Sequence, residues 1–206
     1  MIVMLNTSHD LAECSRELGA PVEQLHTPLN GFRVYDETAR FAIDNGAYAR
    51  FDADRFAALL GKHESRADLC RFVAAPDVVG DARRTIEVFH LWESRLVGWP
   101  VALVAQNGQE DLPIPWNSIK AVFIGGDTAW KMSSHATAII RAANALGKWV
   151  HVGRVNTPGR FEYFEKAGAD SIDGTGLGLY SHMRQRIFEK VNRPTLGLEE
   201  ARDGKG

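Results

Sequence analysis

Short runs of apolar residues recur along the chain and alternate with segments in which apolar residues return at helical spacing. Residues 1–5 (MIVML) predict a buried strand, and residues 10–18 predict a helix for which Ser8 supplies the N-cap. The next segment, residues 19–40, contains turn residues and shows little periodicity. We therefore expect a loop there, with at most a short helix or an edge strand.

Six further apolar runs predict strands, and most of them precede a helical pattern. The strands begin at Phe41, Cys70, Val101, Ala121, Trp149 and Asp170. Helices are expected over residues 52–63, 82–96, 133–146, 158–167 and 182–191. Gly147 is the expected C-cap of the helix over 133–146.

Strands that are almost continuously apolar and alternate with helices are typical of a parallel sheet buried on both faces. Either a (β/α)8 barrel or an open doubly wound sheet fits this order. Polar residues recur at the C-terminal ends of many strands rather than at one switch point, which favours the barrel. We expect a compact α/β TIM-type barrel as a single domain over residues 1–195, with an irregular or missing eighth strand, and a polar, flexible tail at 196–206.

Size and cysteine content fit an ordinary intracellular domain. The 206 residues, 45% of them hydrophobic, suit one domain with a substantial core. Cys14 and Cys70 are too few for a disulfide framework or a cysteine-rich zinc site, so we expect free thiols. The opening residues lack the pattern of a signal peptide, and no apolar run approaches the roughly 18 residues of a membrane helix. We therefore expect a cytoplasmic protein without membrane attachment.

The predicted strand ends carry most of the candidate chemistry. Their residues are Asp44, Asp77, Gln106, Gly125, Gly126, His151, Arg154 and Asp173. Several carboxylates at one mouth suit a reaction in which one carboxylate attacks an electrophilic carbon and another moves a proton. They also suit a divalent metal, which prefers oxygen ligands. Each Asp taken alone also fits a helix N-cap or a turn.

Other residues near these strand ends have both structural and functional interpretations. Gly125 and Gly126 either let the backbone turn or let a flat ligand approach backbone N–H groups. His151 is either a hydrogen-bonded barrel histidine or a ligand-binding group. The run of glycines from Gly174 to Gly178 lacks the full spacing of a dinucleotide-binding fingerprint. Candidates for stacking on a base, although most should be packing residues, are Tyr48, Phe72, Phe123, Trp130 and Trp149.

Taken in order, these strand-end motifs resemble those of the tRNA-guanine transglycosylases. The matching segments are Asp44-Asn-Gly-Ala-Tyr48, Asp77, Gln106, Phe-Ile-Gly125-Gly126 and Gly-Ala-Asp-Ser-Ile-Asp173-Gly. The chain is more similar still to the compact DpdA-type relatives, which exchange guanine in DNA for a 7-deazaguanine base. The resemblance covers about residues 41–178.

The resemblance implies two catalytic carboxylates and a base-binding edge. Asp173 matches the nucleophilic aspartate, which attacks C1′ of the guanosine and forms a covalent glycosyl–enzyme intermediate. Asp44 matches the carboxylate that protonates the leaving guanine and later deprotonates the incoming base. The positions that match the guanine-binding edge are Asp77, Gln106, Gly125 and Gly126, and further substrate-binding candidates are Tyr48, His151 and Arg154.

Two departures from the tRNA enzymes favour DNA or a smaller nucleoside-like substrate over tRNA. Both cysteines lie in the first 70 residues, so the C-terminal Cys/His zinc subdomain that helps to hold tRNA is absent. The arginine-bearing region after the nucleophile is reduced to residues 174–180. Basic residues form either a phosphate-binding edge or an ordinary solvated face; they are Arg154, Arg160, Arg184, Arg186, Lys190 and Arg193.

A formal net charge of −2 supplies no global basic field for nucleic acid, so a polyanion would be held by local Lys and Arg clusters. A partner protein that helps to hold the nucleic acid fits this weak charge and the small size. We expect a guanine transglycosylase that acts on DNA or RNA with a 7-deazaguanine base, and with neither cofactor nor metal. The alternatives are an N-glycosidase or ribosyltransferase acting on free nucleosides, a non-catalytic nucleic-acid-binding barrel, and a metal-dependent hydrolase.

Overall fold

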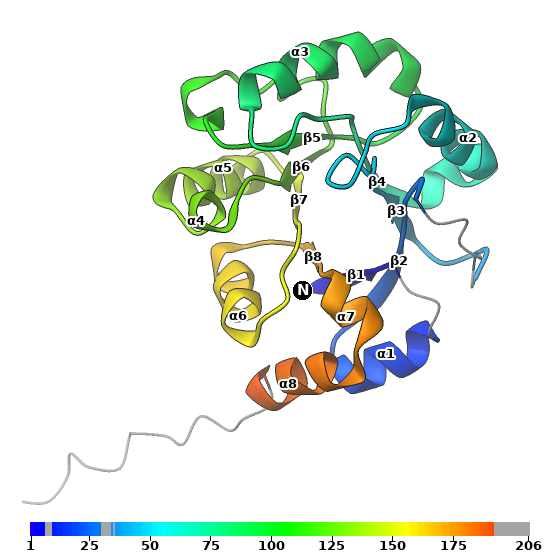
Figure 1. Cartoon of the computed structure of the whole chain (residues 1–206), viewed down its shortest axis with the longest axis vertical. Helices are drawn as coiled ribbons and strands as arrows, with labels where there is room; N and C mark the ends of the chain where they lie inside the picture. Colours follow the sequence, from blue (N-terminus) through cyan, green and yellow to red (C-terminus); the bar gives the residue numbers. More distant parts are fainter. Residues whose placement is uncertain (7–9, 30–33, 35, 192–206) are drawn as a thin grey trace, which may run out of the picture.

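Eight parallel strands form a closed barrel in which each strand pairs with its neighbours in sequence and β8 returns to β1 (Figure 1). The computed structural model describes residues 1–6, 10–29, 34 and 36–191. The strands are β1 (Ile2–Leu5), β2 (Val22–His26), β3 (Phe41–Ile43), β4 (Cys70–Ala74), β5 (Val101–Ala105), β6 (Ala121–Ile124), β7 (Trp149–Val152) and β8 (Ser171–Asp173). The TIM-type barrel expected from the sequence is confirmed.

Helices surround the barrel (Figure 1). The α-helices are α1 (Leu11–Leu18), α2 (Ala53–His63), α3 (Ala82–Trp92), α4 (Thr128–Lys131), α5 (Ser134–Ala145), α6 (Pro158–Ala167), α7 (Thr175–Leu179) and α8 (Ser181–Val191). Short 3-10 helices span Glu64–Leu69, Glu93–Leu96 and Gln109–Asp111. Six of the described helices begin at a side chain that accepts a backbone N–H of the first turn, which stabilises the helix start; these N-caps are Asp10, Asp52, Asp81, Asp127, Ser133 and Thr157.

The strand that the sequence analysis did not find is β2, and it lies within the segment expected to be a loop. Val3 of β1 pairs with Val22, and Phe41 of β3 pairs with Gln24, so β2 completes the ring. The expectation of a missing or irregular eighth strand is therefore wrong. Polar residues such as Glu23 interrupt the apolar pattern of this strand. The strand accommodates Glu23 because its carboxylate accepts two hydrogen bonds of 2.7 and 3.0 Å from the Arg71 guanidinium.

Helix boundaries differ from the expected ones at three places. Asp10 caps α1 by accepting the N–H of Glu13 at 2.9 Å; the expected cap Ser8 lies outside the described residues. Leu146, rather than Gly147, is the C-cap of α5. The helix expected to reach Leu96 ends at Trp92 and continues as a 3-10 turn.

Apolar residues fill two separate layers of the barrel. Along β1, Met4 points into the barrel interior, whereas Val3 and Leu5 pack in the layer between the strands and the helices. This alternation is the period of two that a strand imposes on its side chains. The interior layer consists of Met4, Leu25, Ala42, Phe72, Ala74, Ala102, Val104, Ala121 and Phe123.

The last described helix, α8, is joined to the first helix, α1, by an ion pair with a buried guanidinium. Arg184 of α8 is 3% exposed, and its guanidinium donates to the Glu17 carboxylate of α1 and, at 2.7 Å, to the carbonyl oxygen of Leu177. Arg184 is therefore unavailable to a phosphate group, contrary to the phosphate-binding edge considered above. Arg193 and the expected tail at 196–206 lie outside the described residues.

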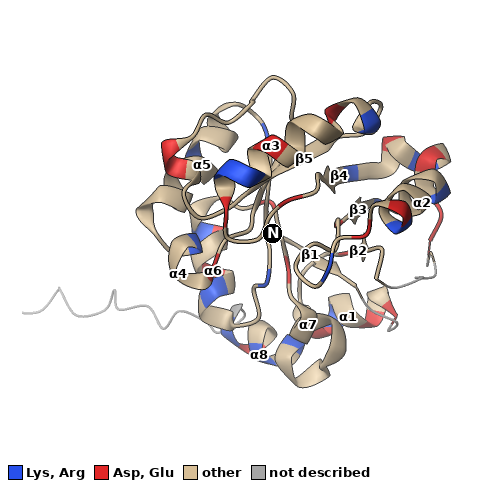
Figure 2. Cartoon of the chain, turned by 45° about the horizontal axis from the view of Figure 1, so that its top comes forward, with Lys and Arg blue, Asp and Glu red and all other residues tan. Residues whose placement is uncertain are grey.

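Charged residues of both signs are interspersed on the helices around the barrel (Figure 2). Lys190 of α8 lies 3.5 Å from the Glu162 carboxylate of α6, and the same carboxylate receives a 2.7 Å hydrogen bond from Lys166. Of the helices in the described part of the chain, none combines the length and apolar character needed to cross a membrane.

We predict that Glu17→Ala lowers the free energy of unfolding by about 3 kcal/mol, because it leaves the buried guanidinium of Arg184 without its counter-charge. Urea unfolding measures this loss. The matched control is Lys166→Ala, which breaks an exposed pair on α6 and should cost less than about 0.5 kcal/mol. Equal losses in the two variants would contradict a stabilising role for the Glu17–Arg184 pair.

Candidate active site

A pocket of about 270 Å³ opens at the C-terminal ends of the strands. Because all eight strands are parallel, their C-terminal ends form one rim, which is where barrel enzymes place their chemistry. Every strand, or the segment that follows it, contributes at least one lining residue. In strand order these residues are Asn6, Thr27, Asp44, Asp77, Gln106, Gly125, Gly153 and Asp173.

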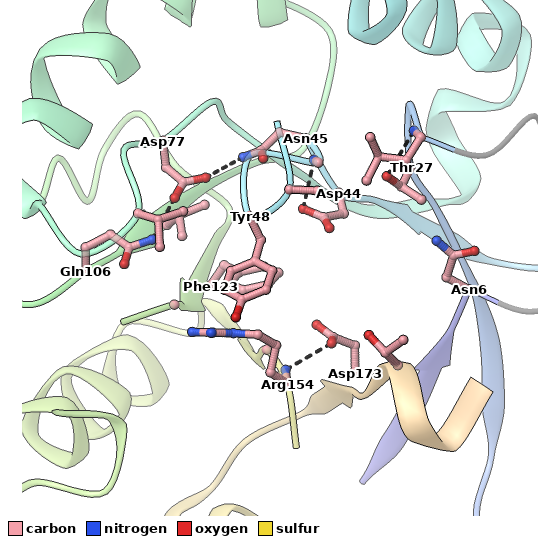
Figure 3. Close-up of a pocket in the computed structure, with 18 residues that line it drawn as sticks. Asn6, Thr27, Asp44, Asn45, Tyr48, Asp77, Gln106, Phe123, Arg154 and Asp173 are labelled. Carbon is pink, nitrogen blue, oxygen red and sulfur yellow. Dashed lines mark hydrogen bonds between the residues drawn. The ribbon is translucent and has the colours of Figure 1, made fainter. Parts of the chain in front are cut away.

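Asp44 follows β3 directly and faces Asp173 across the pocket (Figure 3). The chain turns sharply after it, because Gly46 has a φ of +77° and its N–H points back to the Asp44 carboxylate at 3.4 Å. Burial is the largest influence on Asp44, followed by the negative charge of Asp173. Together they raise the pKa of Asp44 from 3.8 to about 7.

Asp173 is the last residue of β8, and both of its carboxylate oxygens accept a hydrogen bond. The backbone N–H of Arg154 donates to Oδ1 at 2.9 Å. Nε2 of His151 lies 3.0 Å from Oδ2. Hydrogen bonds to both oxygens fix the orientation of the carboxylate.

A chain of hydrogen bonds inside the barrel orients His151. The indole N–H of Trp149 donates to Oγ of Ser171 at 2.8 Å, and the same hydroxyl lies 2.9 Å from Nδ1 of His151. A carboxylate only accepts hydrogen bonds, so Nε2 of a neutral His151 carries the proton and Nδ1 accepts from Ser171. The donors thus run in one direction, from Trp149 through Ser171 and His151 to Asp173.

A second polar network fixes Asp77 on the opposite side of the pocket (Figure 3). Nδ2 of Asn45 donates to Oδ1 of Asp77 at 2.8 Å, and Nε2 of Gln106 donates to Oδ2 at 2.6 Å. The Gln106 amide oxygen in turn accepts the N–H of Gly126 at 2.8 Å and that of Gly80 at 2.9 Å. Burial raises the pKa of Asp77, an effect that these hydrogen bonds oppose.

Tyr48 and Arg154 lie together at the mouth of the pocket. The guanidinium carbon of Arg154 is 4.3 Å from the centre of the Tyr48 ring, which is 68% exposed. The same guanidinium donates to the carbonyl oxygen of Gly126. Phe123 lies deeper in the pocket, where its ring centre is 4.6 Å from that of His151.

Glycine is required where the pocket wall passes close to other groups. A Cβ at Gly125 would lie 2.7 Å from Nε2 of Gln106, and one at Gly153 would lie 2.7 Å from the Phe123 ring. Both distances are shorter than a carbon atom tolerates. The absence of side chains at Gly125 and Gly153 therefore keeps the two polar networks in place beside an open cavity.

The structure brings most of the predicted site residues to this pocket. The lining includes Asp44, Tyr48, Asp77, Gln106, Gly125, Arg154 and Asp173. His151 and Gly126 lie behind the lining: His151 is fully buried and reaches the pocket only through Asp173, and Gly126 only through Gln106 and Arg154.

Sequence analysis did not single out several lining residues, namely Asn6, Thr27, Asn45, Gly153 and Thr175. Asn6 directly follows β1 and Thr27 directly follows β2. A search of the position after each predicted strand would therefore have identified Asn6, and also Thr27 if β2 had been predicted. Among the residues that the structure describes, no group of three or more His, Cys, Asp or Glu side chains is placed to hold a metal ion.

Comparison with known proteins does not place the chain in a family: no protein-family model matches it, and no curated protein does.

We predict that Asp44→Asn stabilises the protein at alkaline pH. The folded protein holds the Asp44 proton up to about pH 7, whereas the unfolded chain releases it near 3.8, so the stability of the wild-type protein falls as the pH rises through this window. Above pH 7 the variant should have a Tm higher by at least roughly 2–4 °C, the equivalent of 1 kcal/mol in a domain of this size.

Thermal unfolding followed by circular dichroism at several pH values measures this difference, which should shrink as the pH falls toward 3.8. Asp54→Asn, at an exposed position of α2, is the control and should show no such pH-dependent gain. A Tm difference that did not vary with pH would contradict the raised pKa of Asp44.

Proposed function

We propose that this protein is a guanine transglycosylase that exchanges guanine in nucleic acid, with DNA the favoured substrate, for a 7-deazaguanine base. The observation that carries the proposal is the pair of carboxylates in one pocket. Asp173 is held by a hydrogen-bond donor at each oxygen, and Asp44 has a pKa of about 7. Two carboxylates in such different environments can divide nucleophilic attack and proton transfer between them.

In the first step, an oxygen of Asp173 attacks C1′ of the target nucleotide and forms a glycosyl ester. The C1′–N9 bond breaks, and its electron pair leaves with the guanine. Protonated Asp44 gives its proton to the departing base, so guanine leaves neutral. A pKa near 7 suits this role, because the group is partly protonated at neutral pH and still releases its proton readily.

The second step reverses the first with a different base. The Asp44 carboxylate takes the N9 proton of the incoming 7-deazaguanine, whose nitrogen then attacks C1′. The ester bond to Asp173 breaks, and Asp173 returns to its charged form. Each carboxylate ends the cycle in the state in which it began, so no further reactant is needed.

The opposite wall of the pocket offers a fixed polar edge for a purine. Asp77 is held by Asn45 and Gln106, so its remaining lone pairs have a defined direction toward N–H donors of a base. Tyr48 supplies an exposed aromatic face at the mouth. Asp77 and Gln106 match base-binding positions of the transglycosylases that the sequence resembles.

A base in a duplex reaches this pocket only after it is flipped out of the stack. Because charges of both signs are mixed on the helices, local contacts or a partner protein would supply the rest of the grip on DNA or RNA (Figure 2). We place this reaction in the cytoplasm.

We predict that Asp173→Asn abolishes guanine release from DNA, because an amide does not form the glycosyl ester. The measurement uses DNA with labelled guanine, a parallel tRNA sample and an added 7-deazaguanine base. A denaturing gel detects the covalent complex between protein and nucleic acid. Asp54→Asn, a change of the same chemistry on the surface, should retain full exchange.

Three outcomes of this experiment would change the proposal. Full exchange by Asp173→Asn would remove that residue from the mechanism. Turnover of free guanosine without polymer would favour a nucleoside N-glycosidase or ribosyltransferase. Binding of nucleic acid without base release or covalent complex, across DNA and tRNA, would favour a non-catalytic binding barrel.

We also predict a pH dependence for the first step. Formation of the covalent intermediate requires protonated Asp44, so its rate should fall by about tenfold per pH unit above about 7. Single-turnover measurements over a range of pH test this directly. Asp44→Asn should be slow at every pH and lack this limb, and a wild-type rate that is flat through neutral pH would assign the proton to another group.

A further inference from the structure

Lys131 is a buried lysine that the proposed mechanism does not use. It ends α4, it is 2% exposed, and its ammonium group donates to the carbonyl oxygen of Gly153. None of the described carboxylates forms an ion pair with it. Burial of an ammonium without a contacting counter-ion is costly, so its position calls for an explanation.

The peptide bond that Lys131 contacts is the one that holds Asp173. The carbonyl of Gly153 and the N–H of Arg154 belong to a single peptide unit, and that N–H donates to Oδ1 of Asp173 at 2.9 Å. The ammonium group, the peptide dipole and the carboxylate therefore lie in sequence, with the positive charge at the negative end of the dipole.

The backbone is strained at the same peptide unit. Arg154 has a φ of +61°, and it is the one residue other than glycine with positive φ in the described chain. A Cβ at the preceding Gly153 would lie 3.3 Å from Oδ2 of Asp173 and 2.7 Å from Phe123. Strain of this kind persists where the surrounding contacts impose it and is concentrated at functional sites.

We infer that Lys131 is a positioning residue that acts on Asp173 through the Gly153–Arg154 peptide bond. Lys131 does not line the pocket, so it has no direct contact with a substrate there. Its charge polarises the peptide and strengthens the hydrogen bond to Oδ1, which fixes one oxygen of Asp173 while the carboxylate is aimed at C1′. The inference rests on the proposed function and adds a residue that orients its nucleophile, Asp173.

Burial and the neighbouring charges determine the pH range in which Lys131 is protonated. Burial lowers its pKa to about 8, and the positive charges of Arg154 and Arg160 contribute to the shift, whereas the carboxylates of Asp173 and Asp127 oppose it. Lys131 is therefore mostly charged at neutral pH and loses its proton as the pH rises through about 8.

The first test compares Lys131→Met with Lys148→Met. Lys148 also donates to a backbone carbonyl, that of Ile119 at 2.8 Å, but it lies at the opposite end of the barrel, before β7. Lys131→Met should slow formation of the covalent intermediate by on the order of 100-fold. Lys148→Met should leave the rate unchanged.

The pH profile separates positioning from a purely structural role. In a plot of the logarithm of the rate against pH, the wild-type rate falls above about pH 7 because Asp44 loses its proton. It should fall more steeply above about pH 8, where Lys131 loses its proton, and Lys131→Met should lack this second change of slope. A loss of rate with the second change of slope retained, or one explained by a lower Tm, would overturn the inference.

The second test needs no activity. In protein carrying 13C-lysine, NMR follows the titration of Lys131 in the wild type and in Asp173→Asn. Loss of the carboxylate charge should lower the pKa of Lys131 below about 8, because Asp173 is one of the groups that raise it. An unchanged titration would overturn the inference. A shifted titration, together with a wild-type protein that exchanges no guanine, would support the coupling of Lys131 to Asp173 and refute the proposed function alone.

Discussion

The pairing of β8 with β1 is the interaction on which the rest of the molecule depends. This ladder closes the barrel, and its register sets Met4 of β1 beside Asp173 of β8. Closure makes all the strand ends into one rim, so residues separated by more than a hundred positions in sequence face each other. The buried pair of Glu17 and Arg184 reinforces the same junction from outside the sheet.

The pocket and the layer directly behind it hold groups that a stable core would exclude. Asp44, Asp77 and Lys131 are ionisable, and burial shifts the pKa of each toward its neutral form. Their burial costs free energy that the apolar layers of the barrel must offset. The same low-polarity surroundings strengthen every hydrogen bond that orients Asp173, so the cost of burying these groups and the firm placement of Asp173 have one cause.

The sequence predicted the barrel and most of the rim because both follow from local patterns. Apolar runs locate strands, and the residue after each run belongs to the rim, which is how Asp44, Gln106 and Asp173 were found. β2 was not predicted because Glu23 interrupts its apolar pattern. The strand accommodates Glu23 through its ion pair with Arg71, a contact that no local pattern shows. Ser8 was a reasonable cap by residue type, but Asp10 has the geometry to accept the N–H of Glu13.

The relations between residues were beyond the sequence. His151 acts on Asp173 through a hydrogen bond whose direction depends on Ser171 and Trp149. Lys131 contacts the Gly153–Arg154 peptide next to a positive φ at Arg154, a conformation that residues other than glycine rarely adopt. Such features depend on backbone conformation and on packing, and residue identity alone does not specify them.

The rim built from every strand also bears on how the chain becomes chemically competent. Asp44 directly follows β3 and Asp173 ends β8, the last strand of the described barrel, so the two carboxylates meet only when the ring closes. Before the ring closes the two carboxylates are therefore apart, and opening of β8 alone would separate them again. In the proposed mechanism, the attacking group and the proton donor are thus brought together only by completion of the fold.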